Sequence, residues 1–355
     1  MKIPLLNNRD AMLEIDSRGA LASIEQFGDQ VQDVWKTANS ISPIDVSKFN
    51  KIVVAGMGGS ILGTHVIQTL FSSELLVPVL IAPDYEVPKY VDENTLVVAS
   101  SYSGTTAETI SATKDAIRKN AHLSGITSGG DISEILSESD APFLKFETTH
   151  NPCGVPRMGL GYAIFGQIAL FAKLGFLSVT DEMYREVLES IAYAQLQFSV
   201  AVEQDKNAAK LLAYELVDRL PLIIGSEHLD GAAHIFSNQL NENSKQLATY
   251  FTTPELNHHL LEALDFPKQS ELSTITIALH SDLYHPENTR RLELTEELFH
   301  KHSLETRAFT LHSKTKLGQV FELIVFSWYV SYYLAILNSV SPGETSQVEW
   351  FKSAL

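Results

Sequence analysis

The stretch Lys51-Ile-Val-Val-Ala-Gly-Met-Gly-Gly-Ser60 decides the fold class of this chain. The apolar run Ile52–Ala55 predicts a buried strand, and the glycines after it predict a tight turn. Ser60 is suited to cap a helix that begins where the glycines end. A strand, a glycine turn and a helix in this order are typical of a βαβ unit in a parallel sheet.

The same alternation continues along the rest of the chain. Short apolar runs alternate with helical stretches in 50–146, and the pattern resumes after a helical region over 181–218. Parallel strands need such crossover helices, so the sequence predicts an α/β protein with two parallel-sheet halves. The predicted strands are 52–55, 79–81, 96–99, 123–127 and 143–146, then 222–224, 249–252, 274–278 and 306–311.

Residues 1–48 differ from this alternation. Apolar positions at helical spacing run from Leu21 to Trp35, without a predicted strand. A chain of 355 residues also exceeds the usual length of one domain. We therefore predict an N-terminal helical extension over 1–48, one α/β domain over 49–178 and a second over 179–355.

The charge balance restricts the classes of partner. The chain has 26 Lys and Arg against 43 Asp and Glu, a formal net charge of −17. An acidic surface repels polyanions over a Debye length of about 8 Å, which argues against nucleic-acid and anionic-membrane binding. A small anion held by local backbone amides is still compatible with this charge.

Neither disulfides nor membrane spans are expected. Cys153 is the one cysteine, and polar residues interrupt the N-terminal segment too early for a signal peptide. Polar residues interrupt the apolar stretch Met158–Leu177, and Leu323–Leu337, at 15 residues, is shorter than the roughly 20 that a span needs. We expect two buried helices and a cytoplasmic protein.

The glycine turn before Ser60 permits three interpretations. Gly56, Gly58 and Gly59 superficially suggest a dinucleotide-binding loop, but Ile61 stands where that motif needs its last glycine. A simple capped turn is the second interpretation. An anion site at the start of a helix is the third.

A stronger candidate site follows the strand predicted at 96–99. The sequence Ser101-Tyr-Ser-Gly-Thr-Thr106 places four hydroxyl side chains around Gly104, where a strand gives way to a helix. A helix cap needs one hydroxyl, whereas several hydroxyls and amides together can hold a phosphate dianion. Hydroxyls suit an acidic protein because they bind phosphate without adding positive charge. This segment predicts a phosphate-binding loop.

Together, the glycine turn and this loop resemble the sugar isomerase (SIS) fold. The whole set of motifs resembles more closely the bifunctional phosphoglucose/phosphomannose isomerases, over most of 50–355. The resemblance implies two SIS-type αβα sandwich domains with parallel five-stranded sheets and a sugar-phosphate site in the first. The residues implied to bind substrate there are Gly58, Gly59, Ser60, Ser101, Ser103 and Thr106.

Two further segments resemble the family's proton-transfer residues. In Asn151-Pro-Cys-Gly-Val-Pro-Arg-Met158, the resemblance implies that Arg157 stabilises an enediolate, a task that suits an always-charged guanidinium. In Asn238-Gln-Leu-Asn-Glu-Asn-Ser-Lys245 it implies that Glu242 is the general base. Without the resemblance, Arg157 would be a capping residue and Glu242 would form a solvated ion pair with Lys245.

The remaining matches lie toward the C-terminus. Thr253-Pro-Glu-Leu-Asn-His258 implies that His258 opens the sugar ring, a task for a group that titrates near neutrality. Lys352 matches a lysine that assists ring opening, and Thr345 a small residue that leaves room for either C2 epimer. Alone, His258 and Lys352 would be surface residues.

Two departures from the family pattern affect the substrate assignment. Thr105 stands where asparagine is more usual, and Ile61-Leu62 replaces a glycine and a small residue. No metal is expected, because the 12 histidines show no zinc-type spacing and His258 and His259 are neighbours whose side chains diverge. No organic cofactor is needed either, since the substrate's carbonyl acidifies the proton.

We therefore expect an isomerase that interconverts glucose 6-phosphate, and mannose 6-phosphate, with fructose 6-phosphate through a cis-enediolate. The alternatives are a non-catalytic phosphosugar-binding regulator and an isomerase of another sugar phosphate. An amidotransferase half would need an N-terminal cysteine, which Met1-Lys2 does not supply. The resemblance also implies a homodimer in which His258 reaches the partner's site.

Overall fold

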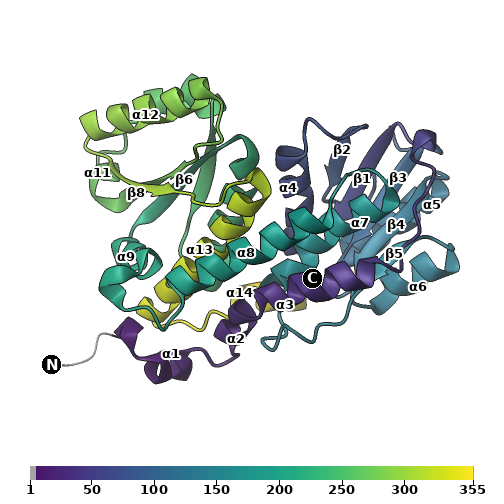
Figure 1. Cartoon of the computed structure of the whole chain (residues 1–355), viewed down its shortest axis with the longest axis horizontal. Coiled ribbons are helices and arrows are strands. Elements are labelled where there is room, and N and C mark those ends of the chain that lie inside the picture. Colours follow the sequence, from purple (N-terminus) through teal and green to yellow (C-terminus); the bar gives the residue numbers. More distant parts are fainter. Residues whose placement is uncertain (1–4, 355) are drawn as a thin grey trace. The chain divides into compact units, whose positions relative to one another are not determined.

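The computed structural model describes residues 5–354. Its contacts divide the chain into two compact units (Figure 1). We call Gln26–Arg185 the first unit, and the second unit comprises Glu186 onward together with the start of the chain up to Glu25. Each unit has its own parallel sheet with helices on both faces, so the predicted α/β class is confirmed.

The first sheet has five parallel strands in the order β2-β1-β3-β4-β5, and all five predicted strands are present. In the central pair, Ala55 lies opposite Ala99 and Gly56 opposite Ser100. This register brings the loops after β1 and β3 to the same edge of the sheet. The strands are β1 Lys51–Gly56, β2 Val79–Ala82, β3 Thr95–Ser100, β4 His122–Thr127 and β5 Phe143–Lys145.

Helices cover both faces of this sheet (Figure 1). On one face, α5 (Ala107–Arg118) and α6 (Gly130–Glu138) pack on small and branched apolar side chains such as Val53 and Val97. The other face is covered by α3 (Phe27–Ala38), α4 (Leu62–Leu70), a π-helical turn (Gly161–Phe165) and α7 (Gly166–Leu174).

The second sheet has four parallel strands within the described residues, in the order β7-β6-β8-β9. The expectation of a second five-stranded sheet was therefore wrong. Only four β-branched runs alternate with helices in this half of the sequence, and each of them forms a strand. The strands are β6 Leu220–Ser226, β7 Thr249–Thr253, β8 Thr274–His280 and β9 Glu305–Thr310.

On one face of the second sheet, α10 (Asp230–Asn243) packs on β6, β7 and α13 (Lys316–Leu337). On the other face, α12 (Pro286–Lys301) packs on β7, β8 and β9. The region predicted as helical over 181–218 contains α8 (Asp181–Phe198) and α9 (Ala208–Glu215). A short helix, α11 (Ser270–Ser273), precedes β8.

Helix α13 is longer than its apolar run indicated. It has 22 residues and begins at Lys316, because the Thr315 hydroxyl accepts the Gly318 N–H and so caps the start of the helix. By length and composition alone it could cross a membrane, but 94% of its most apolar window is buried inside the structure. The expectation of a buried helix is confirmed, although the argument from a length of 15 residues was wrong.

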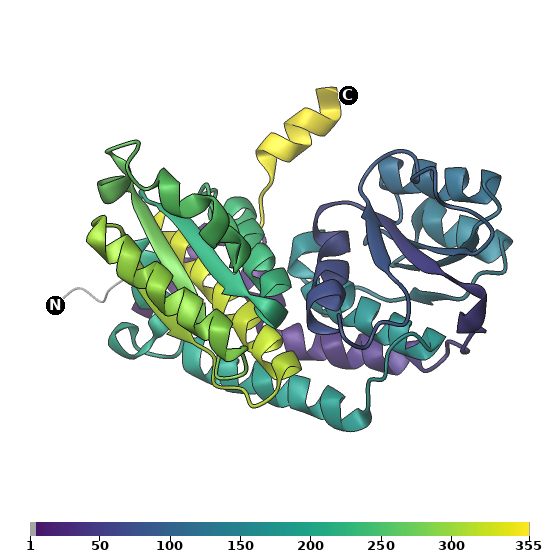
Figure 2. The same cartoon turned by 90° about the horizontal axis from the view of Figure 1, so that it is seen from above.

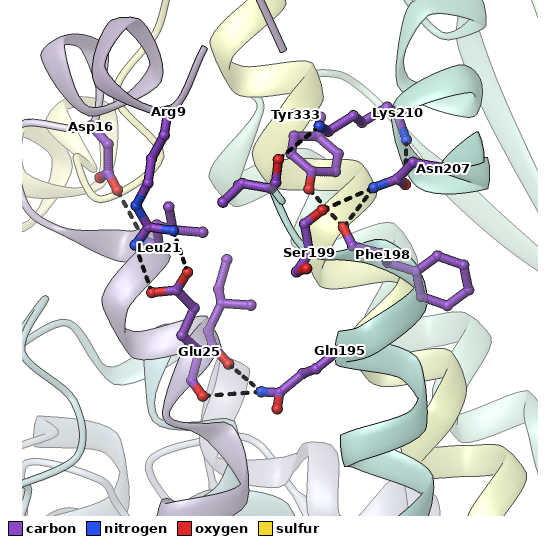
Figure 3. A network of polar contacts seen from close by, with 12 residues as sticks. Arg9, Asp16, Leu21, Glu25, Gln195, Phe198, Ser199, Asn207, Lys210 and Tyr333 are labelled. Carbon is purple, nitrogen blue, oxygen red and sulfur yellow. Dashed lines mark hydrogen bonds and ion pairs between the residues drawn. The ribbon is translucent and has the colours of Figure 1, made fainter. Parts of the chain in front are cut away.

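Polar contacts hold the first two α-helices of the chain together (Figure 3). The Asp16 carboxylate accepts the N–H groups of Ala20 and Leu21, both at 2.8 Å, and so caps α2 (Ala20–Glu25). Arg9 of α1 (Arg9–Ile15) donates two hydrogen bonds to Glu25, at 2.7 and 2.9 Å.

A buried lysine continues this network. Lys210 of α9 is fully buried and donates hydrogen bonds to the carbonyls of Val200 and Val202 and to the Asn7 side chain. These three oxygens accept hydrogen bonds from the three N–H donors of its ammonium group. The predicted extension 1–48 is therefore divided between the units, because α1 and α2 belong to the second unit and α3 to the first. The domain boundary at residue 178 stays a prediction.

Candidate functional site

The loops after β1 and β3 are joined by hydrogen bonds. The Ser100 hydroxyl donates to the Ser60 carbonyl at 2.6 Å, and the Tyr102 N–H donates to the Ser60 hydroxyl at 3.1 Å. Gly58 and Gly104 adopt left-handed φ angles of 51° and 72°, which favour glycine. The structure therefore brings Gly58, Gly59 and Ser60 next to the hydroxyl-rich segment 101–106.

Hydroxyl groups line the 101–106 loop as the sequence predicted. The Ser101 and Thr106 hydroxyls lie 3.0 Å apart, and the Ser103 and Thr105 hydroxyls 2.9 Å apart. Thr106 is the N-cap of α5, and its own side chain makes no cap hydrogen bond to the first amides of that helix. Uncapped amides and the positive end of the helix dipole suit an anion.

The equivalent loops of the second sheet are closed by a carboxylate. Glu227 follows β6, which takes the same place in its sheet as β1, and has a left-handed φ of 46°. Its Oε1 accepts the His285 N–H at 2.6 Å and the Asn288 amide at 2.8 Å, at the start of α12. A protein anion thus occupies this edge of the second sheet, and the open hydroxyl-lined loop belongs to the first.

Arg157 lies in a 3₁₀ turn, Pro156–Met158, and is 9% exposed. The loop that carries it is connected to the 101–106 loop through Asn151, whose amide donates to the Tyr102 hydroxyl at 2.8 Å and to the Val155 carbonyl at 2.9 Å. The Tyr102 ring packs on Gly159 so closely that a Cβ there would lie 2.3 Å from the ring.

Gln30 supports the same loop and was missed in the sequence. Its Nε2 donates to the carbonyls of His150 and Met158, both at 3.0 Å, and its Oε1 accepts the Gly161 N–H at 3.0 Å. The side chain is fully buried in α3. One signal existed, because Gln30 interrupts the apolar stripe of this helix at a buried position.

Glu242 lies in the last turn of α10 and is partly exposed. The asparagines beside it are fixed: Asn241 exchanges two hydrogen bonds with the Ala248 backbone, and Asn243 donates to the Ser331 hydroxyl of α13. The Lys245 ammonium donates to the carbonyls of Glu242 and Asn243 at the end of the helix. This anchoring explains why asparagines flank Glu242.

His258 ends the 3₁₀ turn Glu255–His258 after β7, and its side chain is exposed. The neighbouring Asn257 amide donates to the Thr295 hydroxyl of α12 at 2.8 Å and holds this turn. The His259 ring is 2.8 Å from the Glu255 carboxylate. Within residues 5–354, no group of three or more His, Cys, Asp and Glu side chains is arranged to hold a metal.

Lys352 lies on α14 (Ser346–Ala354), a helix without a buried residue. The Thr345 hydroxyl donates to Glu349 at 3.1 Å in its first turn. The helix extends away from the rest of the second unit (Figure 2), and its Trp350 and Phe351 are 68% and 57% exposed. The predicted substrate-binding loops and Arg157 thus belong to the first unit, and Glu242, His258, Thr345 and Lys352 to the second.

Residues 205–355 match a family described as "Bacterial phospho-glucose isomerase C-terminal SIS domain". The chain is also 32% identical over 336 residues to the bifunctional phosphoglucose/phosphomannose isomerase of Caldicellulosiruptor bescii. The matched stretch covers 94% of this chain and 98% of that relative. This chain belongs to the bifunctional phosphoglucose/phosphomannose isomerase family. The resemblance in the sequence motifs is thereby confirmed.

Another member of the phosphoglucose/phosphomannose isomerase family, from Thermoplasma volcanium, is 30% identical over 93% of this chain and 99% of its own length. Among solved structures, a hypothetical protein from Thermus thermophilus superposes with a TM-score of 0.73 at 15% identity, over 99% of this chain and 94% of that one. At this identity the likeness shows the fold alone.

Proposed function

We propose that this phosphoglucose/phosphomannose isomerase family member interconverts glucose 6-phosphate and mannose 6-phosphate with fructose 6-phosphate. The observation that carries the proposal is the match along nearly the whole chain to relatives of that name. The open, hydroxyl-lined loop of the first sheet supports it, because a sugar phosphate supplies the small dianion that such a loop can hold.

In the proposed complex the phosphate binds to Ser60, Ser101, Ser103 and Thr106 and to amides at the start of α5. Gly58 and Gly59 let the backbone approach the ligand, since nothing lies within 4 Å of a Cβ built at either position. Neutral donors hold the phosphate here, so the negative net charge of the chain does not oppose its binding locally.

The proposed chemistry is a proton transfer between C1 and C2. His258 and Lys352 open the sugar ring, by moving a proton from the C1 hydroxyl to the ring oxygen. Glu242 then removes the C2 proton of the aldose, the electrons move to the carbonyl oxygen, and the enediolate forms. Arg157 stabilises its negative charge. The proton then returns from Glu242 to C1 while the O2 hydroxyl proton moves to O1, which leaves the C2 carbonyl and the C1 hydroxyl of fructose 6-phosphate.

We further propose that the enzyme works as a cytoplasmic homodimer. The exposed position of His258 supports a role in the partner's site, as in the family resemblance. Substrate and product are intermediates of glycolysis and gluconeogenesis. No metal or organic cofactor takes part in the proposed steps.

The experiment that tests the proposal is a coupled assay. Purified protein is given fructose 6-phosphate, and glucose 6-phosphate is detected with glucose-6-phosphate dehydrogenase. We expect turnover by the wild type and its loss in Glu242→Gln, with Glu262→Gln as the control because Glu262 is an exposed carboxylate of the same unit. Absence of turnover, or an active Glu242→Gln enzyme, would refute the proposal. Phosphosugar binding without turnover would instead indicate a regulator.

The role of Lys352 is tested by deleting residues 352–355. Since no residue of α14 is buried, this deletion should leave the melting temperature unchanged. We expect loss of activity with the fold intact. Full activity of the shortened chain would remove Lys352 from the mechanism.

A further inference from the structure

A buried glutamine lies behind the glycine turn of the first unit. Gln167 interrupts the apolar stretch Met158–Leu177 and is fully buried near the start of α7. Its amide nitrogen donates to the Ser60 carbonyl and, at 3.0 Å, to the Ser100 hydroxyl. Its amide oxygen accepts the Thr64 hydroxyl at 2.7 Å. One buried side chain of the first unit therefore connects the segments that follow β1 to the end of β3.

The backbone around Gln167 permits this contact. The π-helical turn Gly161–Phe165 comes just before α7 and has a hydrogen bond between residues five apart. Such a turn contains one residue more than an α-helical turn, so it changes the direction in which the following side chains point. A Cβ on Gly63 of α4 would lie 2.8 Å from the Ala163 carbonyl oxygen and 2.9 Å from the Gln167 side chain. The close approach of α4 and α7 therefore requires glycine at position 63.

The hydrogen bonds of Gln167 converge on Ser60. The Ser60 carbonyl also accepts the Ser100 hydroxyl at 2.6 Å, so side chains from α7 and β3 hold the same oxygen. The Ser60 hydroxyl accepts the Tyr102 N–H at 3.1 Å. A hydroxyl that accepts one hydrogen bond still has its proton to donate. The backbone and the hydroxyl oxygen of Ser60 are thereby fixed, and its proton can be donated to an anion.

We infer that Gln167 is a positioning residue for phosphate binding and that it acts through Ser60. The inference rests on the proposed function, in which the Ser60 hydroxyl binds the substrate's phosphate. Rotation of the Ser60 carbonyl would carry the hydroxyl away from the 101–106 loop, and the hydrogen bond from Gln167 opposes this rotation. A donor that is already ordered binds its ligand without the entropy cost of being ordered. Gln167 itself is fully buried and does not touch the ligand.

The identity of the residue supports this role over simple packing. The other buried residues of α7 are glycine or apolar, and an apolar side chain would fill the same space. Burial of an amide costs free energy unless its hydrogen bonds are made, so a glutamine is an expensive way to fill a core. The bonds that compensate this cost go to the glycine turn, to the first turn of α4 and to the end of β3.

This role predicts an effect on every ligand that carries a phosphate. Glucose, mannose and fructose 6-phosphates share this group, and inorganic phosphate consists of it. In the proposed complex Ser60 contacts only the phosphate. Loss of the Gln167 contacts should therefore weaken the binding of all four ligands by a similar factor, whatever the configuration of the sugar.

The test measures the Kd of inorganic phosphate by calorimetric titration and the KM of fructose 6-phosphate. Gln167→Leu removes every hydrogen bond, whereas Gln167→Glu keeps an oxygen for Thr64 and removes the donors to Ser60. We expect both variants to raise Kd and KM about 3–10-fold, the effect of losing one hydrogen bond to the ligand. Thr64→Val lets the amide turn and should give a smaller rise. If Gln167→Leu does not fold, the other two variants decide.

A double-mutant cycle separates positioning from stability. If Gln167 acts through Ser60, Gln167→Leu should raise the phosphate Kd no further when Ser60→Ala is already present. Together with Ser103→Ala it should raise Kd by its full factor, because the Ser103 hydroxyl contacts Thr105 instead. Additive effects of Gln167→Leu and Ser60→Ala would overturn the inference.

Ser124→Ala is the matched control. Ser124 of β4 is fully buried and donates to the Pro142 carbonyl at 2.6 Å, so this variant should lower the melting temperature and leave the phosphate Kd unchanged. Variants of Gln167 that lower only the melting temperature would show a purely structural role and refute the inference, as would a wild type that binds no phosphate. A wild type that binds phosphate but turns over no sugar phosphate contradicts the proposed function instead, and the Kd values still decide the role of Gln167.

Discussion

The Asn151 amide donates a 2.8 Å hydrogen bond to the Tyr102 hydroxyl. This bond connects the hydroxyl-lined loop after β3 to the loop that carries Arg157. In the proposed reaction one loop holds the phosphate and the other faces the enediolate. The bond therefore fixes the position of the hydroxyl-lined loop relative to the loop of Arg157 within the first unit.

Tyr102→Phe should weaken this connection while the ring stays packed on Gly159. We expect a loss of about 1 kcal/mol in the free energy of unfolding, the usual contribution of one hydrogen bond. We also expect kcat to fall more than KM rises, because Arg157 is less well positioned for the transition state. Tyr85→Phe is the control, since Tyr85 is 47% exposed. An unchanged kcat in Tyr102→Phe would contradict this role.

Gln30→Ala should be strongly destabilising although Gln30 lies outside the family motifs. It removes three hydrogen bonds and leaves buried backbone groups unpaired, which costs about 3 kcal/mol or more. Gln32→Ala, at an exposed position of the same helix, should change stability by less than about 0.5 kcal/mol. Urea unfolding measures both, and equal effects would show that the Gln30 contacts carry no stability.

Gly104→Ala should disrupt the hydroxyl-lined loop 101–106, which we propose binds the phosphate. Gly104 has a φ of 72°, and a Cβ there would lie 1.7 Å from the Gly129 carbonyl oxygen. The loop must move, so we expect KM for fructose 6-phosphate to rise at least tenfold. Gly129→Ala is the matched control, because nothing lies within 4 Å of its Cβ position. Normal KM in Gly104→Ala would remove this loop from substrate binding.

His228 should make the protein sensitive to acid. Its side chain is 2% exposed, and burial lowers its pKa from 6.5 to about 4. His228 in the unfolded chain therefore binds a proton more readily than in the folded protein. Its contribution to the free energy of unfolding is fully present above pH 6.5 and is lost as the pH falls toward 4. The loss is about 3 kcal/mol. His228→Gln should remove this part of the pH dependence in unfolding experiments between pH 7 and 4.

His280 provides the opposite case for comparison. Its hydrogen bond to Glu296, 3.0 Å away, raises its pKa above 6.5. The stability that this pair contributes is present below pH 6.5 and is lost as the pH rises through the raised value. His280→Gln should therefore destabilise the protein mainly at low pH. If both variants shift the pH profile in the same direction, these assignments are wrong.

The strands and the clustering of hydroxyls in the loop after β3 could be predicted because their signals are local. Each β-branched run between helical stretches forms a strand, and the Ser101–Thr106 hydroxyls gather where the strand ends. The length of α13 was underestimated because polar residues such as Gln319 and Glu322 are buried in its first turns, where hydropathy gives no signal.

The contacts that support the candidate site could not be predicted in the same way. Gln30 reaches residues 150–161 across more than a hundred positions of sequence, and Tyr102 meets Asn151 only because two loops lie together at one edge of a sheet. Glu227 closes the second sheet's loops through His285 and Asn288, a pairing that strand order creates. Such contacts depend on tertiary register, which the motifs do not encode.

The central claim is proton transfer at C2 of a sugar phosphate, and one measurement tests it most directly. Fructose 6-phosphate is incubated with the enzyme in D₂O and followed by NMR. We predict that glucose 6-phosphate and mannose 6-phosphate both appear, with deuterium at C2 from exchange on the Glu242 carboxyl, and that Glu242→Gln forms neither. Aldose that still lacks deuterium at C2 after equilibration over many turnovers, as a direct hydride shift would give, or no aldose at all, would contradict the proposed enediolate mechanism.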